Sequence, residues 1–457
     1  MGMGIKIDSR TYNQSAYYRS MTSTLLKSST IAPLNSPTIH RLPNGLTIVA
    51  EQMPVEAVNF NLWNPIGSAI EANEINGMAH FLEHMIFKGT EQLLSGEFER
   101  KIEERGAVTN AATSQDYTHY YITTAPKDFA ALAPLQMDVV LNPSIPDRAF
   151  EKERLVVLEE IRRSQDSPNR RTYYQAMELA FQQLPYRRPV LGPIETIESL
   201  IPQQMRDFHA SWYQPESLTA VAVGNLPVEE MIEIIAEGFN QVKPQVSGEC
   251  DRTSTSDPWQ MFAPEPGFRE IVRQEIVDDT LQQARLVMMW RVPGLNDIER
   301  TYALDVLACI LGRGRTSRMV KDLREDRELI SGISVSNINH RLQGIFYISV
   351  DLPSENLPIV EAAIVQHIRT LHHELVSAVE ISRIRTQVAN RFIFANETPS
   401  DRANLYGYYQ SMLKDLTPAF DYPDIIQSVQ PVDILEATQT YLSPDAYGVL
   451  IVRPKEH

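Results

Sequence analysis

The chain repeats its own pattern at a constant distance of 227 residues. "LWNPIG" around Trp63 recurs as "MWRVPG" around Trp290, and "EKERLVVLEE" recurs as "AVEISRIRTQ" at the same offset. Near the ends of the two copies, "WYQPESLTAVAV" resembles "TYLSPDAYGVLIV". Because chance explains such a constant offset poorly, the pattern predicts a duplicated domain of about 200 residues.

The duplication divides the chain into two halves. A length of 457 residues already suggests two or more domains. We place the first half at residues 36–243 and the second at residues 269–457. The polar, proline-bearing residues 244–268 are the expected linker, and residues 1–35 form an N-terminal extension.

Strand and helix patterns are mixed within each half. "TIHRLPNGLTIVAEQM" predicts two strands joined by an Asn-Gly turn, and "VNFNLW" alternates as a strand does. A helix is expected next, ending at Gly89 as its C-cap. "THYYITTAP" and "LTAVAVGN" indicate strands, and "RAFEKERLVVLEEIRRSQ" indicates a helix. This ordering is typical of an α+β fold.

Charge and hydropathy exclude some classes of partner. The formal net charge of −16 argues against nucleic acid as the main partner. The two cysteines, Cys250 and Cys309, lack a CxxC pattern, so we expect no disulfide framework. We also expect no membrane span, because no apolar run approaches the roughly 18 residues that a spanning helix needs.

The leader favours a cytoplasmic location. The first 34 residues lack the continuous apolar segment of a secretory signal. They contain ten Ser or Thr residues, four basic residues and a single acid, a composition that also resembles a transit peptide.

The segment "MAHFLEHMIFKGT" carries two histidines and a glutamate with metal-site spacing. Because a helix turns about 100° per residue, His80 and His84 stand about 40° apart on one face. Glu83 lies on the same broad side of the helix. A catalytic zinc takes three protein ligands, of which the two histidines supply two. Glu83 suits the role of general base in this H-x-x-E-H signature. A solvated helix face is the alternative interpretation of the bare motif.

The second half lacks these polar residues. The counterparts of the two histidines and the glutamate are all apolar: Leu307, Ile310 and Leu311. If the polar residues were needed for folding, their counterparts would be expected to be polar as well. The difference favours chemistry that belongs to the first half alone.

The third zinc ligand is expected in "EKERLVVLEEIRR". Glu153 and Glu160 share one helix face, whereas Glu159 lies about 100° away from Glu160. The counterpart of Glu160 is Gln387, which has lost the charge that a zinc ligand needs. Glu153 stays acidic in the copy. We therefore assign Glu160 as the ligand and Glu153 as the carboxylate that orients a ligand histidine. An exposed helix decorated with acids is the alternative.

These motifs resemble the pitrilysin family of inverzincin metallopeptidases, most closely its bacterial and mitochondrial-processing-peptidase-like branch. The resemblance runs from "IHRLPNGLTIV" to the C-terminus. It implies zinc held by His80, His84 and Glu160, with Glu83 as general base and Glu153 in support. It also implies two homologous α+β halves, each a mostly antiparallel sheet packed with helices, around a chamber for peptides.

Two further segments also resemble parts of this family. "GAVTNAATSQDYTHYY" resembles the family's edge strand, to which substrate adds as an extra strand. Asn110 and Ala111 match its substrate-contacting Asn-Ala pair, while an ordinary edge strand would show the same alternation. "LPYRRPVLGPIETI" resembles a family pattern that we interpret as structural. His119 on the presumed edge strand could lie near substrate or in solvent.

One departure from the family concerns the second half. Active relatives place an Arg and a Tyr, seven residues apart, over the substrate. "SRMVKDLREDRELISGIS" matches that segment with Arg324 at the arginine position, but Ser331 stands where the tyrosine is expected. The resemblance therefore implies a zinc-bearing subunit whose homologous partner, or second copy, supplies the Arg-Tyr pair. A self-sufficient enzyme is the alternative.

The function predicted from the sequence is a zinc-dependent endopeptidase acting on peptides or unfolded segments. The main alternative is a non-catalytic assembly subunit of the same fold, since some relatives serve structurally. Those relatives typically lose the zinc motif, whereas all expected ligands and the base are present here. A zinc enzyme acting on non-peptide substrates is a third possibility, against which the expected edge strand argues.

Overall fold

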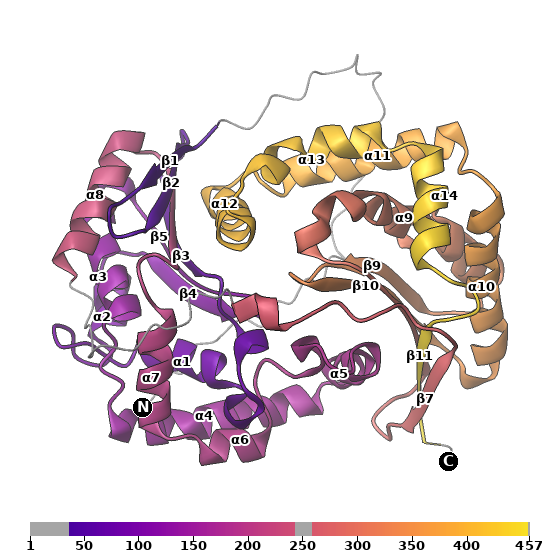
Figure 1. Cartoon of the computed structure of the whole chain (residues 1–457), viewed down its shortest axis with the longest axis horizontal. Coiled ribbons are helices and arrows are strands. Elements are labelled where there is room, and N and C mark those ends of the chain that lie inside the picture. Colours follow the sequence, from indigo (N-terminus) through magenta and orange to yellow (C-terminus); the bar gives the residue numbers. More distant parts are fainter. Residues whose placement is uncertain (1–35, 243–257, 456–457) are drawn as a thin grey trace. The chain divides into compact units, whose positions relative to one another are not determined.

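Two β-sheets with the same strand order organise the computed structural model, which describes residues 36–242 and 258–455 (Figure 1). The first sheet has the order β1-β2-β6-β3-β5-β4 and the second has the order β7-β11-β8-β10-β9. Apart from β1, each strand of the first sheet has its counterpart at the same place in the second. The extension at 1–35 and residues 243–257 lie outside the described part.

The strands of the first sheet are β1 (Thr38–Arg41), β2 (Thr47–Gln52), β3 (Val58–Asn64), β4 (Val108–Thr113), β5 (Thr118–Thr124) and β6 (Thr219–Gly224). Those of the second are β7 (Val272–Val277), β8 (Ala284–Pro293), β9 (Gly332–Ile338), β10 (Gln343–Leu352) and β11 (Gly448–Arg453). Only β2 with β6 and β7 with β11 pair in parallel among the described strands. The prediction of two homologous α+β halves with mostly antiparallel sheets is confirmed.

The helices of the first half are α1 (Met78–Ile86), α2 (Glu97–Glu103), α3 (Phe129–Leu141), α4 (Asp147–Asp166), α5 (Pro168–Ala180), α6 (Ile194–Ser199), α7 (Pro202–Trp212) and α8 (Val228–Gln241). Those of the second are α9 (Tyr302–Gly312), α10 (Leu357–His373), α11 (Ala378–Phe394), α12 (Pro399–Leu413), α13 (Thr417–Ser428) and α14 (Pro431–Tyr441). None of the described helices is long and apolar enough to cross a membrane.

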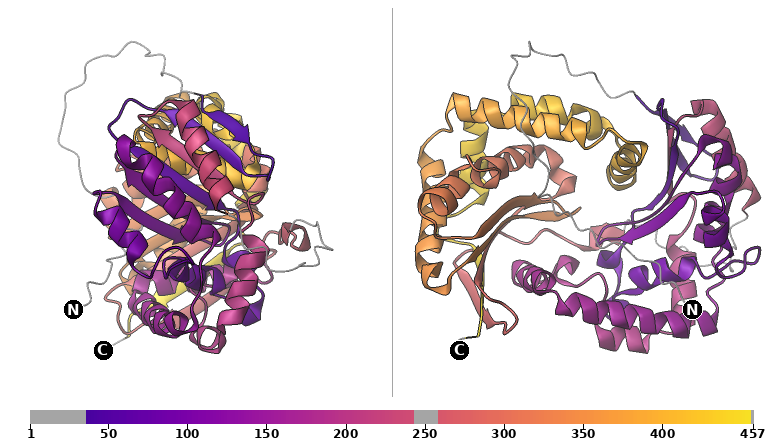
Figure 2. Two further views of the ribbon diagram at one scale, coloured as in Figure 1. Left: turned by 90° about the vertical axis from the view of Figure 1, so that its left-hand side faces the viewer. Right: turned by 180° about the vertical axis from the view of Figure 1, so that it is seen from behind.

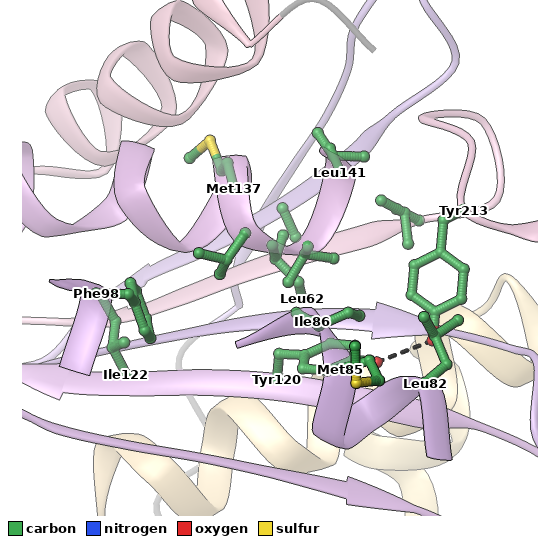
Figure 3. Packing of buried hydrophobic residues seen from close by; sticks show 14 of the residues in the cluster. Leu62, Leu82, Met85, Ile86, Phe98, Tyr120, Ile122, Met137, Leu141 and Tyr213 are labelled. Carbon is green, nitrogen blue, oxygen red and sulfur yellow. Dashed lines mark hydrogen bonds between the residues drawn. The ribbon is translucent and has the colours of Figure 1, made fainter. Parts of the chain in front are cut away.

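The alternation of β3 decides what each face of the first sheet packs against. Phe60 and Leu62 point into the core that α1, α3 and α8 cover. Leu82 and Met85 of α1 lie in the same cluster (Figure 3). A fully buried Leu or Phe side chain contributes roughly 1.5–3 kcal/mol of hydrophobic stabilisation. Packing on its apolar side therefore holds α1 in place while its polar residues face the other way.

Each half contributes one helix to the sheet of the other. From the second half, α12 packs on the first sheet, where Trp63 and Val221 lie in one buried apolar cluster with Tyr406. From the first half, α5 packs on the second sheet through residues such as Met177 and Phe181. Figures 1 and 2 show α12 beside the first sheet and α5 beside the second. The exchange follows the duplication. Helix α5 comes directly after α4, and α12 comes directly after α11, the counterpart of α4.

The glycine that ends the repeated segments "LWNPIG" and "MWRVPG" has a structural explanation in both halves. An added Cβ on Gly67 would lie 2.3 Å from the carbonyl oxygen of Ser114, at the tip of the β4–β5 hairpin. An added Cβ on Gly294 would lie 2.5 Å from that of His340, at the tip of the β9–β10 hairpin. Both glycines therefore allow a hairpin tip to approach the backbone closely.

One predicted boundary is wrong. The helix that carries the histidines ends at Ile86, and Phe87 rather than Gly89 is its C-cap. Gly89 has a φ of +109°, but it lies in the following turn, where its neighbour Thr90 bonds to Leu93. Gly89 therefore marks a turn, as glycine often does. It does not mark the end of the helix, because the backbone leaves the α-helical conformation two residues earlier, at Phe87.

Candidate metal centre

Helices α1 and α4 bring together the three residues predicted to bind zinc. Nε2 of His80 and Nε2 of His84 each lie 3.5 Å from Oε2 of Glu160. One ligand atom from each of the three side chains lies within 4.8 Å of the others. Both imidazoles are buried and Glu160 is partly buried. The two helices pack against each other, which sets this spacing.

The arrangement fits a tetrahedral metal. Zinc bonds to His nitrogen and carboxylate oxygen at about 2.0–2.2 Å, so tetrahedral ligand atoms are about 3.4 Å apart. The observed nitrogen–oxygen separations of 3.5 Å are close to that value. In addition, Nε2 of His84 is buried and forms no hydrogen bond of good geometry within the described residues, its carboxylate neighbour Oε2 of Glu160 being 3.5 Å away. Buried polar atoms are nearly always satisfied, so this atom is suited to a metal bond.

The two neighbouring acids of α4 differ in position. Glu159 is 51% exposed and forms ion pairs with Arg162 and Arg163 on its own helix. Glu160 turns toward the histidines instead. Partial burial raises the carboxyl pKa of Glu160, but the neighbouring protonated imidazole of His84 outweighs this effect and keeps the pKa below its ordinary value. An ionised carboxylate is the form that binds metal.

Glu153 lies behind His84, two helical turns before Glu160 on α4. Its Oε1 is 3.0 Å from Nδ1 of His84, and its Oε2 is 2.8 Å from Nζ of Lys88. A carboxylate bonded to Nδ1 leaves Nε2 of the same ring facing the other ligands and fixes the ring orientation. Lys88 in turn holds the carboxylate. The sequence did not indicate Lys88, although it lies only four residues after His84, just beyond the end of α1.

The two histidines have opposite protonation preferences in the metal-free site. Burial and the nearby His84 together lower the pKa of His80 to about 3, although the charge of Glu160 opposes them. Burial also disfavours the charged form of His84, but its bonds to Glu153 and Glu160 outweigh that effect and raise its pKa to about 9. At neutral pH His80 is therefore neutral, and His84 carries a proton that a metal would displace.

Glu83 points from α1 toward the end of β4. Its Oε2 accepts a hydrogen bond of 2.5 Å from Oγ1 of Thr113, the last residue of that strand. Burial raises the pKa of Glu83, against smaller lowering effects from His84 and the Thr113 bond. A carboxylate with a raised pKa next to metal ligands has the properties of a general base. Sequence reasoning missed Thr113, for which only its place three residues after Asn110 was a signal.

Strand β4 lies at an edge of the first sheet, as predicted. It pairs with β5 on one side, and no other described strand pairs with it. Asn110 is exposed, and its Oδ1 accepts a hydrogen bond of 2.9 Å from the backbone N–H of Ala111. Free backbone groups on an edge strand can pair with an added peptide strand.

The segment expected over the substrate does not contact the three ligands. Arg324 lies in the π-helical segment Val320–Asp326 and pairs with Glu325 at 2.8 Å. Ser331 donates hydrogen bonds to Oε1 of Gln283 and to the carbonyl of Asp351. Within the described residues, Arg324 makes no hydrogen bond or ion pair with the ligands.

His119 is neither near the ligands nor in solvent. It is buried, stacked on Trp63 with ring centroids 4.3 Å apart, and bonded to Oδ1 of Asn61 at 3.0 Å. Burial lowers the pKa of His119 to about 4, so it is a neutral core residue under α12. An isolated histidine in a strand gave no signal of which sheet face it would occupy.

Comparisons with known proteins agree with this geometry. Residues 47–194 match the family model described as "Insulinase (Peptidase family M16)", and residues 199–388 match "Peptidase M16 inactive domain". The chain is 26% identical over 414 residues to an uncharacterized zinc protease of Rickettsia bellii, which covers 90% of this chain and 97% of that protein. It is also 26% identical over 361 residues to a probable beta subunit of the mitochondrial-processing peptidase of Arabidopsis thaliana, covering 77% of this chain and 66% of that protein.

Solved structures show the same fold. A protease from Helicobacter pylori superposes with a TM-score of 0.83 at 24% identity, over 92% of this chain and all of that chain. Together with the two matched domains, these similarities define the class of the protein. The chain belongs to peptidase family M16, the family of pitrilysin and of proteins named zinc proteases. The resemblance found in the sequence is confirmed.

Proposed function

We propose that the chain is a zinc-dependent endopeptidase whose metal is held by His80, His84 and Glu160. The observation that carries this proposal is the convergence of one ligand atom from each residue within 4.8 Å. The alternative of a non-catalytic subunit has less support. The first half keeps the expected ligands and the base, and apolar residues replace the histidines and the base only in the second half.

The residues around the ligands fit peptide hydrolysis. Zinc, when bound, supplies a Lewis acid that polarises the scissile carbonyl. Glu83 is placed by Thr113 to take a proton from the attacking water and to pass it to the leaving amine. Glu153 holds His84 in the orientation that exposes Nε2 to the metal.

The proposed substrate is an extended peptide or an unfolded segment. Strand β4 offers an edge to which such a peptide adds by backbone hydrogen bonds, next to the exposed Asn110 and the half-buried Ala111. Thr113 at the end of the same strand bonds to the base, so a peptide paired with β4 runs toward Glu83. We assign no nucleic-acid partner, in line with the net charge of −16.

We further propose that the chain is the zinc-bearing member of a two-subunit enzyme, or of a homodimer, in the cytoplasm. Ser331 has no phenol to donate to the substrate, and Arg324 pairs with Glu325. A homologous partner that carries an Arg-Tyr pair would complete the site. The location rests only on the composition of the leader.

Zinc content and peptide hydrolysis of the purified chain, with its partner present, test the central proposal. We expect one zinc per chain and cleavage of unfolded peptides. The variant Glu83→Gln is expected to keep zinc and to lose about 10²- to 10⁴-fold in hydrolysis, the usual contribution of a general base. Absence of zinc from the wild-type protein, or undiminished hydrolysis by Glu83→Gln, would contradict the proposal.

A further inference from the structure

A buried carboxylate outside the predicted site contacts the start of α1. Glu71 is only 4% exposed and lies in the short segment before that helix. Its Oε2 accepts hydrogen bonds from the backbone N–H of Gly77 at 2.7 Å and from Nδ2 of Asn76 at 2.9 Å. Its Oε1 accepts a bond of 2.7 Å from the backbone N–H of Ala79, the residue before His80.

Helix α1 needs such a partner because its own N-cap cannot supply one. The first N–H groups of a helix have no partner within the helix. The N-cap is Gly77, which has no side chain and a φ of +100°. A side chain there would also clash, since an added Cβ would lie 2.6 Å from the carbonyl oxygen of Leu191. The carboxylate of Glu71 therefore does from outside what an N-cap side chain usually does.

The segment that carries Glu71 is itself fixed to the body of the first half. Arg188 donates to Oδ1 of Asn73 at 2.9 Å and to the carbonyls of Ser68 and Ala69 at 3.1 and 3.3 Å. Asn76 also donates to the carbonyl of Pro189 at 3.3 Å. This explains part of the "LPYRRPVLGPIETI" segment, whose Arg188 holds the approach to α1.

The second half has no equivalent of this carboxylate. The counterpart of Glu71 under the 227-residue offset is Ile298. Helix α9, the counterpart of α1, starts without a side-chain cap and carries leucines where α1 carries histidines. Burial raises the pKa of Glu71 to about 7, despite its bonds to Ala79, Asn76 and Gly77 and the charge of Arg188. Glu71 bonds to the first turn of the helix that carries two of the proposed ligands, and its counterpart in the second half is apolar, which indicates a role in the metal centre.

We propose that Glu71 is a positioning residue of the metal centre, which fixes the start of α1 so that His80 and His84 face Glu160 at bonding distance. This inference rests on the proposed zinc site. A metal site tolerates displacements of only about 0.5 Å in its ligands. The bond to the N–H of Ala79 acts one residue before His80, so its loss lets the first turn of α1 shift directly at a ligand.

Glu71→Gln tests the role, with Glu265→Gln as the matched control. Glu265 is also buried and also accepts backbone N–H bonds, from Gln182, Gln183 and Leu184 at 2.7–3.0 Å. It has no contact with α1 among the described residues. The zinc dissociation constant is measured by competition with a chromophoric chelator, and amide hydrogen exchange of residues 78–86 is followed in the metal-free protein.

We expect Glu71→Gln to weaken zinc binding by about tenfold or more, as losses around a metal ligand usually do. Exchange in residues 78–86 should be faster. Glu265→Gln should change zinc affinity by less than about threefold, even if both variants melt at lower temperature. Equal losses in the two variants, or zinc affinity of Glu71→Gln within threefold of wild type, would overturn the positioning role.

Two other outcomes separate this inference from the proposed function. If the wild-type chain binds no zinc, the proposed function fails, and unchanged exchange in residues 78–86 of Glu71→Gln would then overturn the role of Glu71 by itself. If Glu71→Gln does not fold, Glu71→Asp, which keeps the charge on a shorter side chain, is measured against the same thresholds.

Discussion

Oγ1 of Thr113 donates a hydrogen bond of 2.5 Å to Oε2 of Glu83 and so joins the end of edge strand β4 to the residue proposed as base. The two residues are 30 positions apart in the sequence and come from different elements. A peptide that pairs with β4 would therefore lie along the same strand that carries Thr113, the residue bonded to the proposed base. Hydrogen bonds to charged groups are worth about 1.5–3 kcal/mol, enough to affect the orientation of Glu83.

Thr113→Val should lower kcat by about tenfold or more while zinc content stays at the wild-type value. Valine keeps the shape of threonine and the preference for a strand, but it removes the donor. Thr113→Ser, which keeps the hydroxyl, is the control and should retain most of the activity. The measurement is steady-state hydrolysis of an unfolded peptide by the complete enzyme. A valine variant with normal kcat would mean that Glu83 is oriented by other groups.

The duplication allowed much of this fold to be predicted from the sequence. The offset of 227 residues gave two halves, and the pairing of apolar with polar counterparts singled out His80 and His84. It did not give the exchange of α5 and α12 between the sheets. Alternation along a strand predicts two faces, but the helix that covers each face is decided by contacts between residues such as Trp63 and Tyr406, which lie hundreds of positions apart.

Glu160→Gln should abolish stoichiometric zinc binding, whereas Glu159→Gln should leave it unchanged. The amide keeps the size of the side chain but removes the negative charge that a zinc ligand needs. Glu159 is the matched control because it is the adjacent acid on α4 and pairs only with arginines of its own helix. Elemental analysis of the two purified variants decides between them. Full zinc in Glu160→Gln would remove that residue from the site.

Zinc binding should release about one proton at pH 7.5. His84 has a pKa of about 9 in the metal-free site and must lose its proton to bind metal, whereas His80, with a pKa of about 3, is already neutral. Zinc affinity should therefore rise with pH up to about 9. Calorimetry in two buffers of different ionisation enthalpy measures the release.

The control for this proton count is Glu153→Gln, which removes one of the bonds that keep His84 charged. An unperturbed histidine has a pKa of about 6.5 and is mostly neutral at pH 7.5. The variant should therefore release clearly less than the wild-type protein. Equal release by the two proteins would show that Glu153 does not set the protonation of His84.

Gly407→Ala should destabilise the protein by about 1–3 kcal/mol, the usual cost of overpacking. An added Cβ would lie 2.0 Å from Nε1 of Trp63, where α12 crosses the first sheet. This outweighs the helix propensity of alanine, which favours it over glycine by about 1 kcal/mol. Gly238→Ala is the control, because its Cβ would meet the flexible thioether of Met137. Urea unfolding of both variants measures the difference.

The sequence could not indicate the residues that act on the site through others. Glu71, Lys88 and Thr113 are ordinary polar residues in the sequence, and no spacing rule connects them to a metal. Each acquires its contact from the fold. Glu71 lies in the segment before α1, Lys88 lies just after α1, and Thr113 lies at the end of β4. Ligand motifs are local patterns, whereas the groups that orient the ligands depend on tertiary packing.

The last prediction concerns the second half of the site. Zinc and Glu83 can activate water, but the oxyanion that develops on the scissile carbonyl needs further donors. Arg324 is engaged with Glu325, and the hydroxyl of Ser331 is engaged with Gln283. A missing donor of this kind typically costs roughly 10²- to 10³-fold in rate. We therefore expect the chain alone to hydrolyse peptides weakly or not at all, despite holding zinc.

Adding a homologous partner that carries an Arg-Tyr pair should restore activity by about that factor, and the restored activity should disappear when this chain carries Glu83→Gln. The second arm matters because it shows that the zinc subunit, and not the partner, performs the cleavage. Ser331→Tyr in the chain alone asks whether the position itself is sufficient. A gain there without a partner would favour a self-sufficient site within one chain. Full activity of the wild-type chain alone, with no gain from the partner, would exclude the two-subunit arrangement, because the donors would then come from residues already present in this chain.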